Sequence, residues 1–499
     1  MNKPSDSGQA DISTQLSDNL AMMKEIFANC SDITILPWHY GPDLKYSSIS
    51  VYYDTLVQKK EHNYFKETLQ DLVTEQVGPG TSILPEKLFT FYENDGASAQ
   101  SAFVLYSMDQ AVIDVLNGHI VIFFDMWDKA LSYKAMGVEK RQVTEPTTEP
   151  VVLGPKESTI EDLDKNIGML RMRLKSTKFK IEIFAVESET KTQVAYGYLE
   201  GAVLPEVFSE FKQKIDGLQS GEILETSYIE ELIEGSSLNP FPQCRYTERP
   251  DVAVAELLNG KIIVMVDGTG SILICPATFT ELLQSSEDYY QRTLIASLIR
   301  LMRYIAFFIA LMLPSVYIAL STFHTELIPT VLLLAILNSR EGIPFPAIFE
   351  ALIMELSFEL LREAGVRLPR PVGSAVSIVG ALVVGEASIN AGVASPILVI
   401  IVALTGIASF SLPQFNFAVA LRILRFPLMV FSAFLGGYGL MIALLLMWLL
   451  LAHMRTLGQP YMSPLAPFKP KLLSDVLIRA PLQTMLRSPR QLQLKKRRS

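Results

Sequence analysis

Hydrophobic residues change their spacing after Arg292 of the 499-residue chain. Upstream they form short alternating runs and helical stripes separated by turn residues, a pattern typical of α/β domains. Downstream they merge into long stretches with few charges. Residues 304–323 contain no charged side chain, and twenty helical residues are long enough to cross the roughly 30 Å hydrocarbon core of a bilayer. The pattern predicts an α/β region followed by a multi-pass α-helical membrane domain.

The α/β region contains an internal repeat. Residues 116–125 (LNGHIVIFFD) align with residues 258–267 (LNGKIIVMVD) at an offset of 142 positions. In both copies an Asn-Gly dipeptide, which accepts a positive φ at low cost, precedes a hydrophobic run typical of a strand. Alternating runs begin upstream at Ile33 and Ile181. We therefore expect two tandem α/β subdomains, each a small sheet covered by helices, with helical stripes at 65–77 and 208–218.

Changes in composition define the expected domain boundaries. The first cytoplasmic subdomain covers residues 1–143 and the second 157–295, joined by a Pro/Thr/Glu-rich linker at 144–156. The helical membrane domain covers 296–454 and a basic cytoplasmic tail covers 455–499. An apolar stripe between residues 160 and 174 indicates a packed core helix rather than a coiled coil.

The apolar stretches predict about four transmembrane helices. After 304–323, residues 371–421 carry a single charge and are interrupted at 390–396, which indicates two shorter spans. The stretch 426–454 supplies a fourth span. Basic residues flank both ends of the membrane domain and place them on the cytoplasmic side, which requires an even number of crossings.

Five or six crossings are the alternatives. With four, six arginines between positions 340 and 425 lie outside or buried, against the usual excess of basic residues on the cytoplasmic side. Six crossings reduce this conflict if the short run 327–339 spans the bilayer and the last stretch breaks at Gly436 and Gly437. With four crossings, the short run is re-entrant or interfacial.

Charge divides the chain at the same place. Residues 1–292 carry 25 Lys and Arg against 44 Asp and Glu, whereas residues 293–499 carry 18 against 8. Arg300 and Arg303 before the first span orient that span from inside to outside. The basic tail with its run 495–498 is expected on the cytoplasmic face, close to anionic lipid. We expect no secretory signal peptide and no nucleic-acid partner. The three cysteines lack metal-ligand spacing and predict no disulfide.

Glu386 is the first candidate for a functional residue. An ionisable group within a span costs several kcal/mol and is retained chiefly where water, a cation or a counter-charge meets it. Small and polar neighbours suit either a wet path or close helix packing. The candidate pore-lining residues are Ser377, Gly380, Glu386, Ser388 and Asn390. The alternative, of equal weight, is that Arg422 or Arg425 is the counter-charge of Glu386 and that the glycines only pack helices.

A second acidic group precedes this segment. Glu355, Glu359 and Glu363 recur at i+4 positions and therefore share one helix face. Several copies around an axis would make an acidic vestibule that concentrates cations. An interfacial helix with a solvated acidic face is the favoured alternative.

No enzymatic centre is expected. The five histidines, at positions 39, 62, 119, 324 and 453, are scattered, and no catalytic triad or metal set can be assembled from them. Residues 266–270 (VDGTG) resemble part of a phosphate loop, but no Lys-Ser/Thr follows and a turn is the better interpretation. We predict no catalytic residue, no metal and no cofactor.

Several ordered segments of the chain resemble the A subunits of the GerA-type spore germinant receptors. They lie between about residues 154 and 481 and are far more specific together than a single short motif. These segments are FPQCRYTERPD at 241–251, REGIPFP at 340–346, MELSFELLREAGVRLP at 354–369, SIVGALVVGE at 377–386, GQPYMSP at 458–464 and LIRAP at 477–481. Gly270 and Leu482 depart from the family pattern.

The resemblance implies a receptor subunit in the inner membrane of the bacterial spore, with its large N-terminal domain on the core side. It implies a permease-like B subunit and a C-subunit lipoprotein as partners, and a homo-oligomeric ring that encloses a cation path. A related spore protein outside the receptor operons shares the A-subunit fold. We predict a nutrient-gated monovalent-cation channel that triggers germination. The alternatives are a secondary transporter and an anchored signalling scaffold without a pore.

Overall fold

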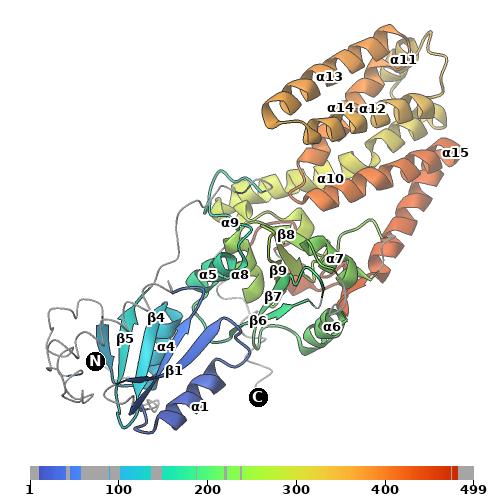
Figure 1. Cartoon of the computed structure of the whole chain (residues 1–499). Coiled ribbons are helices and arrows are strands. Elements are labelled where there is room, and N and C mark those ends of the chain that lie inside the picture. Colours follow the sequence, from blue (N-terminus) through green and yellow to red (C-terminus); the bar gives the residue numbers. More distant parts are fainter. Residues whose placement is uncertain are drawn as a thin grey trace.

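The computed structural model describes residues 11–40, 45–57, 89, 102–135, 146, 149–186, 188–217, 222–235, 239–473 and 475–481, without the side chains of 370–378, 471 and 472. The predicted helical stripe at 65–77 lies outside the described residues. Two sheet-containing units lie at one end of the molecule and a bundle of helices at the other (Figure 1). An α/β region followed by a helical part is therefore confirmed, whereas the individual domain boundaries stay predictions.

The first unit is a five-stranded antiparallel sheet, and helices α1 and α4 pack on one of its faces. Its strands lie in the order β1-β2-β4-β5-β3. Its elements are α1 (Leu16–Ile26), β1 (Ile33–Tyr40), β2 (Tyr46–Tyr53), β3 (Ala102–Leu105), α4 (Met108–Leu116), β4 (His119–Phe124) and β5 (Ala130–Lys134). Residues alternate between the two faces of each strand, so Val121 and Phe123 pack with the helices while Ile120 and Ile122 pack in an aromatic-rich cluster on the other face.

The second unit repeats this topology and covers both faces of its sheet. Its strand order β6-β7-β9-β10-β8 is the order of the first unit, counted from its own first strand. Its elements are α5 (Leu163–Arg173), β6 (Phe179–Ala185), β7 (Gln193–Leu199), α6 (Pro205–Asp216), α7 (Thr226–Glu234), β8 (Arg245–Thr247), α8 (Pro250–Leu258), β9 (Ile262–Val266), β10 (Ile272–Cys275), the 3-10 turn η2 (Glu281–Leu283) and α9 (Glu287–Tyr290). The two Asn-Gly turns precede β4 and β9, and both Gly118 and Gly260 have a positive φ. The repeat seen in the sequence is thus a repeat of topology.

A buried ion pair joins the two units. Arg171 on α5 donates two hydrogen bonds of 2.8 Å to Asp32, which precedes β1. Both side chains are at most 1% exposed, and the Arg171 guanidinium lies 4.4 Å from the Tyr53 ring centroid. The backbone continues the contact, because the Ser31 amide donates to the Ile181 carbonyl at 2.8 Å. The apolar stripe predicted to be a core helix therefore forms α5, which also carries the residue that holds the first unit.

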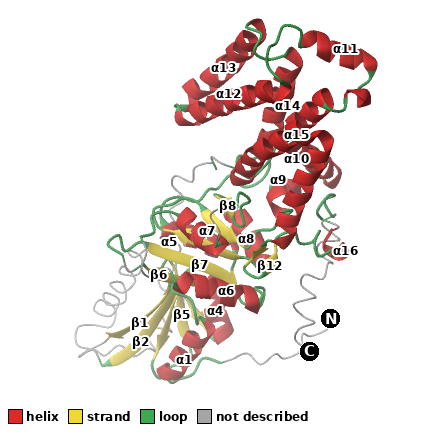
Figure 2. Ribbon diagram, turned by 90° about the vertical axis from the view of Figure 1, so that its right-hand side faces the viewer, coloured by secondary structure: helices red, strands yellow, loops and turns green. Residues whose placement is uncertain are grey.

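The helical part leaves the second unit after α9 and returns to it. It contains α10 (Thr293–Thr322), η3 (Thr325–Leu327), α11 (Thr330–Ser339), α12 (Ala347–Arg367), α13 (Arg370–Asn390), α14 (Pro396–Phe410), α15 (Phe415–His453), the short strands β11 (Arg455–Thr456) and β12 (Gln459–Pro460), and α16 (Pro470–Leu473). Within the described chain, α10 and α15 are the helices long and apolar enough to cross a membrane. Further crossings stay predictions. The bundle extends away from the two sheets (Figure 2).

Helix α15 is folded back on itself at Gly436. This residue has φ 61° and ψ −140°, which interrupts the helix. A Cβ added at Gly439 would lie 2.0 Å from the Phe431 carbonyl oxygen, so the chain reverses tightly here. The break on which the six-crossing alternative depends is present at Gly436, and it lies against Phe323 at the end of α10 that is farther from the sheets. At about 1.5 Å per residue, the two arms, 415–435 and 437–453, are roughly 31 and 26 Å long.

Candidate functional site

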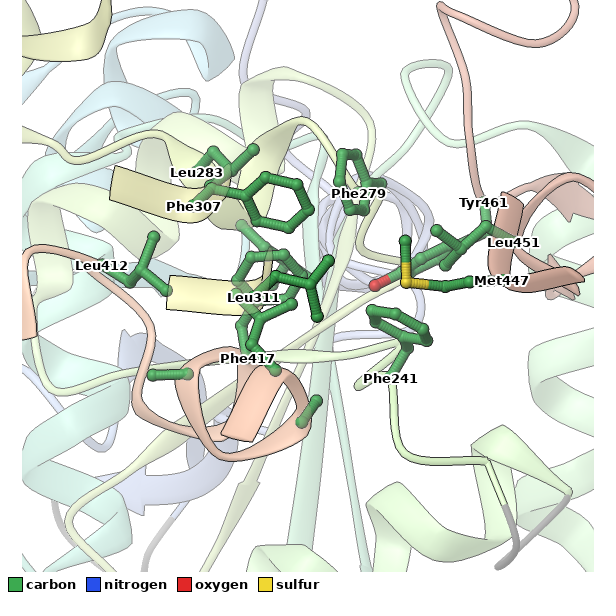
Figure 3. Close-up of a cluster of buried hydrophobic side chains, with 14 of the residues drawn as sticks. Phe241, Phe279, Leu283, Phe307, Leu311, Leu412, Phe417, Met447, Leu451 and Tyr461 are labelled. Atoms are coloured by element: carbon green, nitrogen blue, oxygen red, sulfur yellow. The ribbon is translucent and has the colours of Figure 1, made fainter. Parts of the chain in front are cut away.

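An apolar joint connects the second unit to the helical part. Phe279, on the loop after β10, packs against Phe307 of α10 and Phe417 of α15, with ring centroids 5.6 Å away in both cases. Trp448 on the second arm of α15 and Tyr461 after β12 complete its surroundings at 6.1 and 6.3 Å. Figure 3 shows Phe279 and Phe307 converging with Phe417 and Tyr461. We call this aromatic cluster the joint. Close-packed interiors transmit strain. A displacement of the Phe279 loop must therefore be accommodated by α10 and by both arms of α15.

A charged network lies beside the joint at the start of α10. Arg300 and Arg303 both donate to Asp288 on α9, at 3.1 and 2.9 Å. Asp475 in the C-terminal segment is 3.5 Å from Arg300, and Arg479 donates to the Gln291 carbonyl at 2.9 Å. The two arginines were used in the sequence analysis to orient the first span, and in the structure both are buried and paired with carboxylates. They fix the first turns of α10 to the α/β region, and the membrane orientation inferred from them stays a prediction.

The predicted linker also reaches the helical part. Glu149 accepts a hydrogen bond of 2.9 Å from Gln414, the residue just before α15. It also accepts one of 2.6 Å from Thr247 on β8 and lies 3.6 Å from Arg245. A carboxylate between the two units thus contacts the edge of the second sheet and the entry of a membrane-length helix.

The acidic residues predicted on α12 are largely neutralised within the same chain. Glu355 accepts from Arg425 at 2.5 Å, and both side chains are almost fully buried. Glu359 accepts from Arg422 at 2.7 Å and from Arg362 at 3.2 Å. The exposed Glu363 pairs with Arg367. The three carboxylates share one helix as predicted, but the structure adds a set of arginine partners that the i+4 spacing did not indicate.

Arg422 and Arg425 are therefore occupied by Glu359 and Glu355 rather than by Glu386. Arg425 also donates to the Ala310 carbonyl of α10 at 2.8 Å. These contacts connect α10, α12 and the first arm of α15. Buried ion pairs of this kind are costly to break because the remaining charge is left unpaired.

Glu386 itself lies exposed on α13. Among the described residues, it has no hydrogen-bond or ion-pair partner, and its neighbours Leu382 and Val383 are also exposed. Asn390 is exposed at the end of the helix and Ser388 is half-buried. Gly380 serves packing, since an added Cβ would lie 2.7 Å from the Leu361 side chain on α12. The Ser377 side chain is not described.

Glu350 is a buried residue that the sequence reasoning missed. Its carboxylate is fully buried, 2.9 Å from Arg340, and it accepts a hydrogen bond of 3.2 Å from the Ser395 amide at the start of α14. The Ser395 hydroxyl caps the same helix end by accepting from the Leu398 amide. The signal was an acidic residue in the first turn of an apolar helix, with a Ser-Pro helix start downstream. Glu350 stabilises the ends of two helices rather than facing an open surface.

Within the described residues, no group of three or more His, Cys, Asp or Glu side chains could hold a metal ion. The geometry instead defines a two-part protein, in which duplicated α/β units are coupled through a buried joint to helices of membrane-crossing length.

Comparisons with known proteins agree with this class. The family model described as Bacillus/Clostridium GerA spore germination protein matches residues 21–491. Spore germination protein KA of Bacillus subtilis (strain 168) is 42% identical over 94% of this chain and 85% of its own length. Spore germination protein A1 of the same strain is 34% identical over 95% and 96%. The chain belongs to the GerA spore germination protein family.

Two further relatives were found. An uncharacterized membrane protein of B. subtilis (strain 168), YfkQ, is 40% identical over 96% of this chain and 91% of its own length. The crystal structure of the N-terminal domain of the A subunit of the Bacillus megaterium spore germinant receptor GerK3 is 25% identical. It covers 55% of this chain and 98% of that domain, with a TM-score of 0.42.

Proposed function

We propose that this chain is the A-type membrane subunit of a nutrient receptor in the inner membrane of the spore, and that it conducts monovalent cations as a homo-oligomeric ring. Membership of the GerA family supports the receptor role. The same membership supports a permease-like B subunit and a C-subunit lipoprotein as partners. The large α/β region lies on the core side, and the role is non-enzymatic.

The exposed position of Glu386 carries the conduction proposal. A carboxylate on an apolar helix is costly in hydrocarbon unless water, a cation or another chain contacts it. Arg422 and Arg425, the counter-charges considered for it, are held by Glu359 and Glu355. In a ring, the face of α13 that contains Glu386 and Asn390 lines the axis, where a fixed negative charge raises the local cation concentration.

Substitution of Glu386 tests this proposal. Spores whose only receptor A subunit is Glu386→Gln should release K+ at least about ten-fold more slowly after addition of amino acids, sugars and nucleosides, because the pore loses its fixed charge. The measurement is K+ efflux with a flame photometer, with the amount of receptor protein checked by immunoblot. Glu341→Gln, in an exposed loop between α11 and α12, is the matched control and should release K+ normally. Efflux from the Glu386→Gln spores at the wild-type rate would contradict conduction along α13.

A further inference from the structure

Cys244 and Cys275 face each other across the edge of the second sheet. Strands β8 and β10 are antiparallel, with Ile274 opposite Arg245, so the next position along the ladder places Cys275 opposite Cys244. Directly opposed residues in antiparallel strands have Cα atoms about 4.5–5.5 Å apart and share one face of the sheet. That spacing lies within the range of about 4.4–6.8 Å that a disulfide spans.

The packing of the neighbouring residues independently places both cysteines on one face of the sheet. Leu273 and Tyr246, two positions before and after the cysteines on their strands, belong with both cysteines to the cluster beneath α6 and α7. Ile274 packs on the opposite face. Both thiols are free and almost completely buried, 2% exposed for Cys244 and 0% for Cys275. The two sulfur atoms therefore occupy one enclosed space.

The surroundings keep both thiols unreactive while the sheet is closed. A hydrogen bond to the Cys275 thiol, burial and the nearby Glu230 and Glu234 raise the pKa of Cys244, so in the closed sheet the thiol is protonated and is both a poor metal ligand and a poor nucleophile. Thiol–disulfide exchange therefore requires that the strand open to water. Cys275 donates weakly to the Ile262 carbonyl, with sulfur and oxygen 3.7 Å apart. β8 has only three residues and is an edge strand, so opening it costs less than opening the interior of the sheet.

We propose that Cys244 and Cys275 form a reversible dithiol–disulfide site that reacts with low-molecular-weight disulfides when β8 opens. One cysteine thiolate attacks a sulfur of the small disulfide and releases one small thiol. The second cysteine thiolate then attacks the mixed disulfide and releases the other. Two S–H bonds are lost and one Sγ–Sγ bond forms, while the small disulfide is reduced by two electrons to two thiols.

The bond would hold together the two strands that support the joint. Cys275 lies directly before the loop that contains Phe279, and Cys244 lies two positions after Pro242, whose carbonyl accepts a hydrogen bond of 2.9 Å from the Tyr461 hydroxyl. Oxidation therefore fixes β8 to β10 immediately below the contact between the soluble and helical parts.

Redox titration of the full-length protein tests the site. The chain in detergent micelles is incubated with graded ratios of oxidised to reduced glutathione, in buffer alone and in urea below the unfolding midpoint, which opens the edge strand. After acid quenching and alkylation, peptide mass spectrometry should find a Cys244–Cys275 disulfide at least ten-fold more abundant than any disulfide that includes the buried Cys30. Cys30→Ser should behave like the wild type, and Cys244→Ser should yield at most a glutathione adduct on Cys275.

Three results would overturn the proposal. They are complete alkylation of both cysteines in both conditions, glutathione adducts that never close to the intramolecular bond, and disulfides with Cys30 at comparable abundance. Because wild-type protein gives the primary result, the test does not depend on the folding of any variant.

Discussion

Glu230 lies on α7, four residues before Glu234 and in contact with Tyr246 on β8. Its carboxylate accepts a hydrogen bond of 2.8 Å from the Tyr246 hydroxyl. Burial and the neighbouring Glu234 raise the pKa of Glu230 to about 7. The folded protein therefore holds this proton at pH values where the unfolded chain, with an ordinary glutamate pKa of about 4.5, has already released it.

This difference makes stability depend on pH. Between about 4.5 and 7 the folded state binds more protons than the unfolded state, so raising the pH lowers the free energy of unfolding. The contribution is fully present below pH 4.5 and lost above 7. Glu230→Gln should abolish this part of the pH dependence, which amounts to a few degrees in unfolding temperature. Differential scanning calorimetry from pH 5 to about 8 measures it.

Glu231→Gln, on the exposed side of the same helix, is the control and should keep the wild-type slope. An unchanged slope in Glu230→Gln would show that another group is responsible.

Single residues were the hardest level to predict from the sequence. The cost of an isolated carboxylate in an apolar stretch was enough to select Glu386, and the i+4 spacing correctly placed Glu355 and Glu359 on one helix. Their partners could not be found, because Arg422 and Arg425 lie more than sixty positions away and only the fold brings them close. Glu350 was missed for the same reason, since the Ser395 amide is 45 positions away.

Among the elements, the reversal in α15 depends on two glycines with different roles. Gly436 supplies a positive φ that other residues adopt only with strain. Gly439 allows the second arm to approach the Phe431 carbonyl of the first, where no Cβ fits. The arms then pack together through residues such as Leu428 and Leu440.

Gly439→Ala should therefore disrupt the hairpin. A Cβ 2.0 Å from a backbone oxygen requires the arms to separate, and we expect a loss of stability of more than about 3 kcal/mol. The measurement is the unfolding temperature in detergent together with the monodisperse fraction on size-exclusion chromatography. Gly385→Ala on α13 is the matched control, because its Cβ would make an ordinary contact of 3.5 Å with Val399. Equal behaviour of the two variants would show that the arms are not held closely at Gly439.

Local patterns predicted the elements well where the signal was short-range. Alternation identified β1 and β6, and the Asn-Gly turns identified β4 and β9. The apolar period identified α5, and the interruption at 390–396 separates α13 from α14. The packing of α12 against α13 could not be predicted, because it depends on Gly380 meeting Leu361 across two helices.

At the scale of the whole molecule, the Arg171–Asp32 pair controls how the two α/β units are connected. Both charges are removed from water, so the loss of one partner leaves the other uncompensated. Asp32→Ala should lower the free energy of unfolding by about 3–5 kcal/mol. Urea titration followed by tryptophan fluorescence detects this change, because Trp38 and Trp127 lie in the first unit.

Glu157→Gln provides the comparison. Its pair with Arg173 is half exposed, and such surface pairs contribute at most about 1 kcal/mol. Similar urea midpoints for Asp32→Ala and the wild type would mean that the buried pair does not hold the units together.

The overall architecture followed from the sequence in outline only. The duplication and the change from α/β to helical structure were visible as a repeat and as a loss of charge. The joint was not, because Phe241, Phe279, Phe307 and Phe417 are separate apolar residues that gather only in three dimensions.

The helical part is attached to the α/β region at three places. The start of α10 is bound by Asp288, and the start of α15 is bound through Gln414 and Phe417. The end of α15 is bound by Tyr461, whose carbonyl accepts a hydrogen bond from the Phe279 amide. A single attachment would let the helical part rotate independently of the second unit. Three attachments fix the relative orientation of the two parts, so a tilt or rotation of the second unit is transmitted to the helices. If copies are arranged about an axis, a small rotation of each second unit must rotate the attached α10 and α15 in the same sense in every copy.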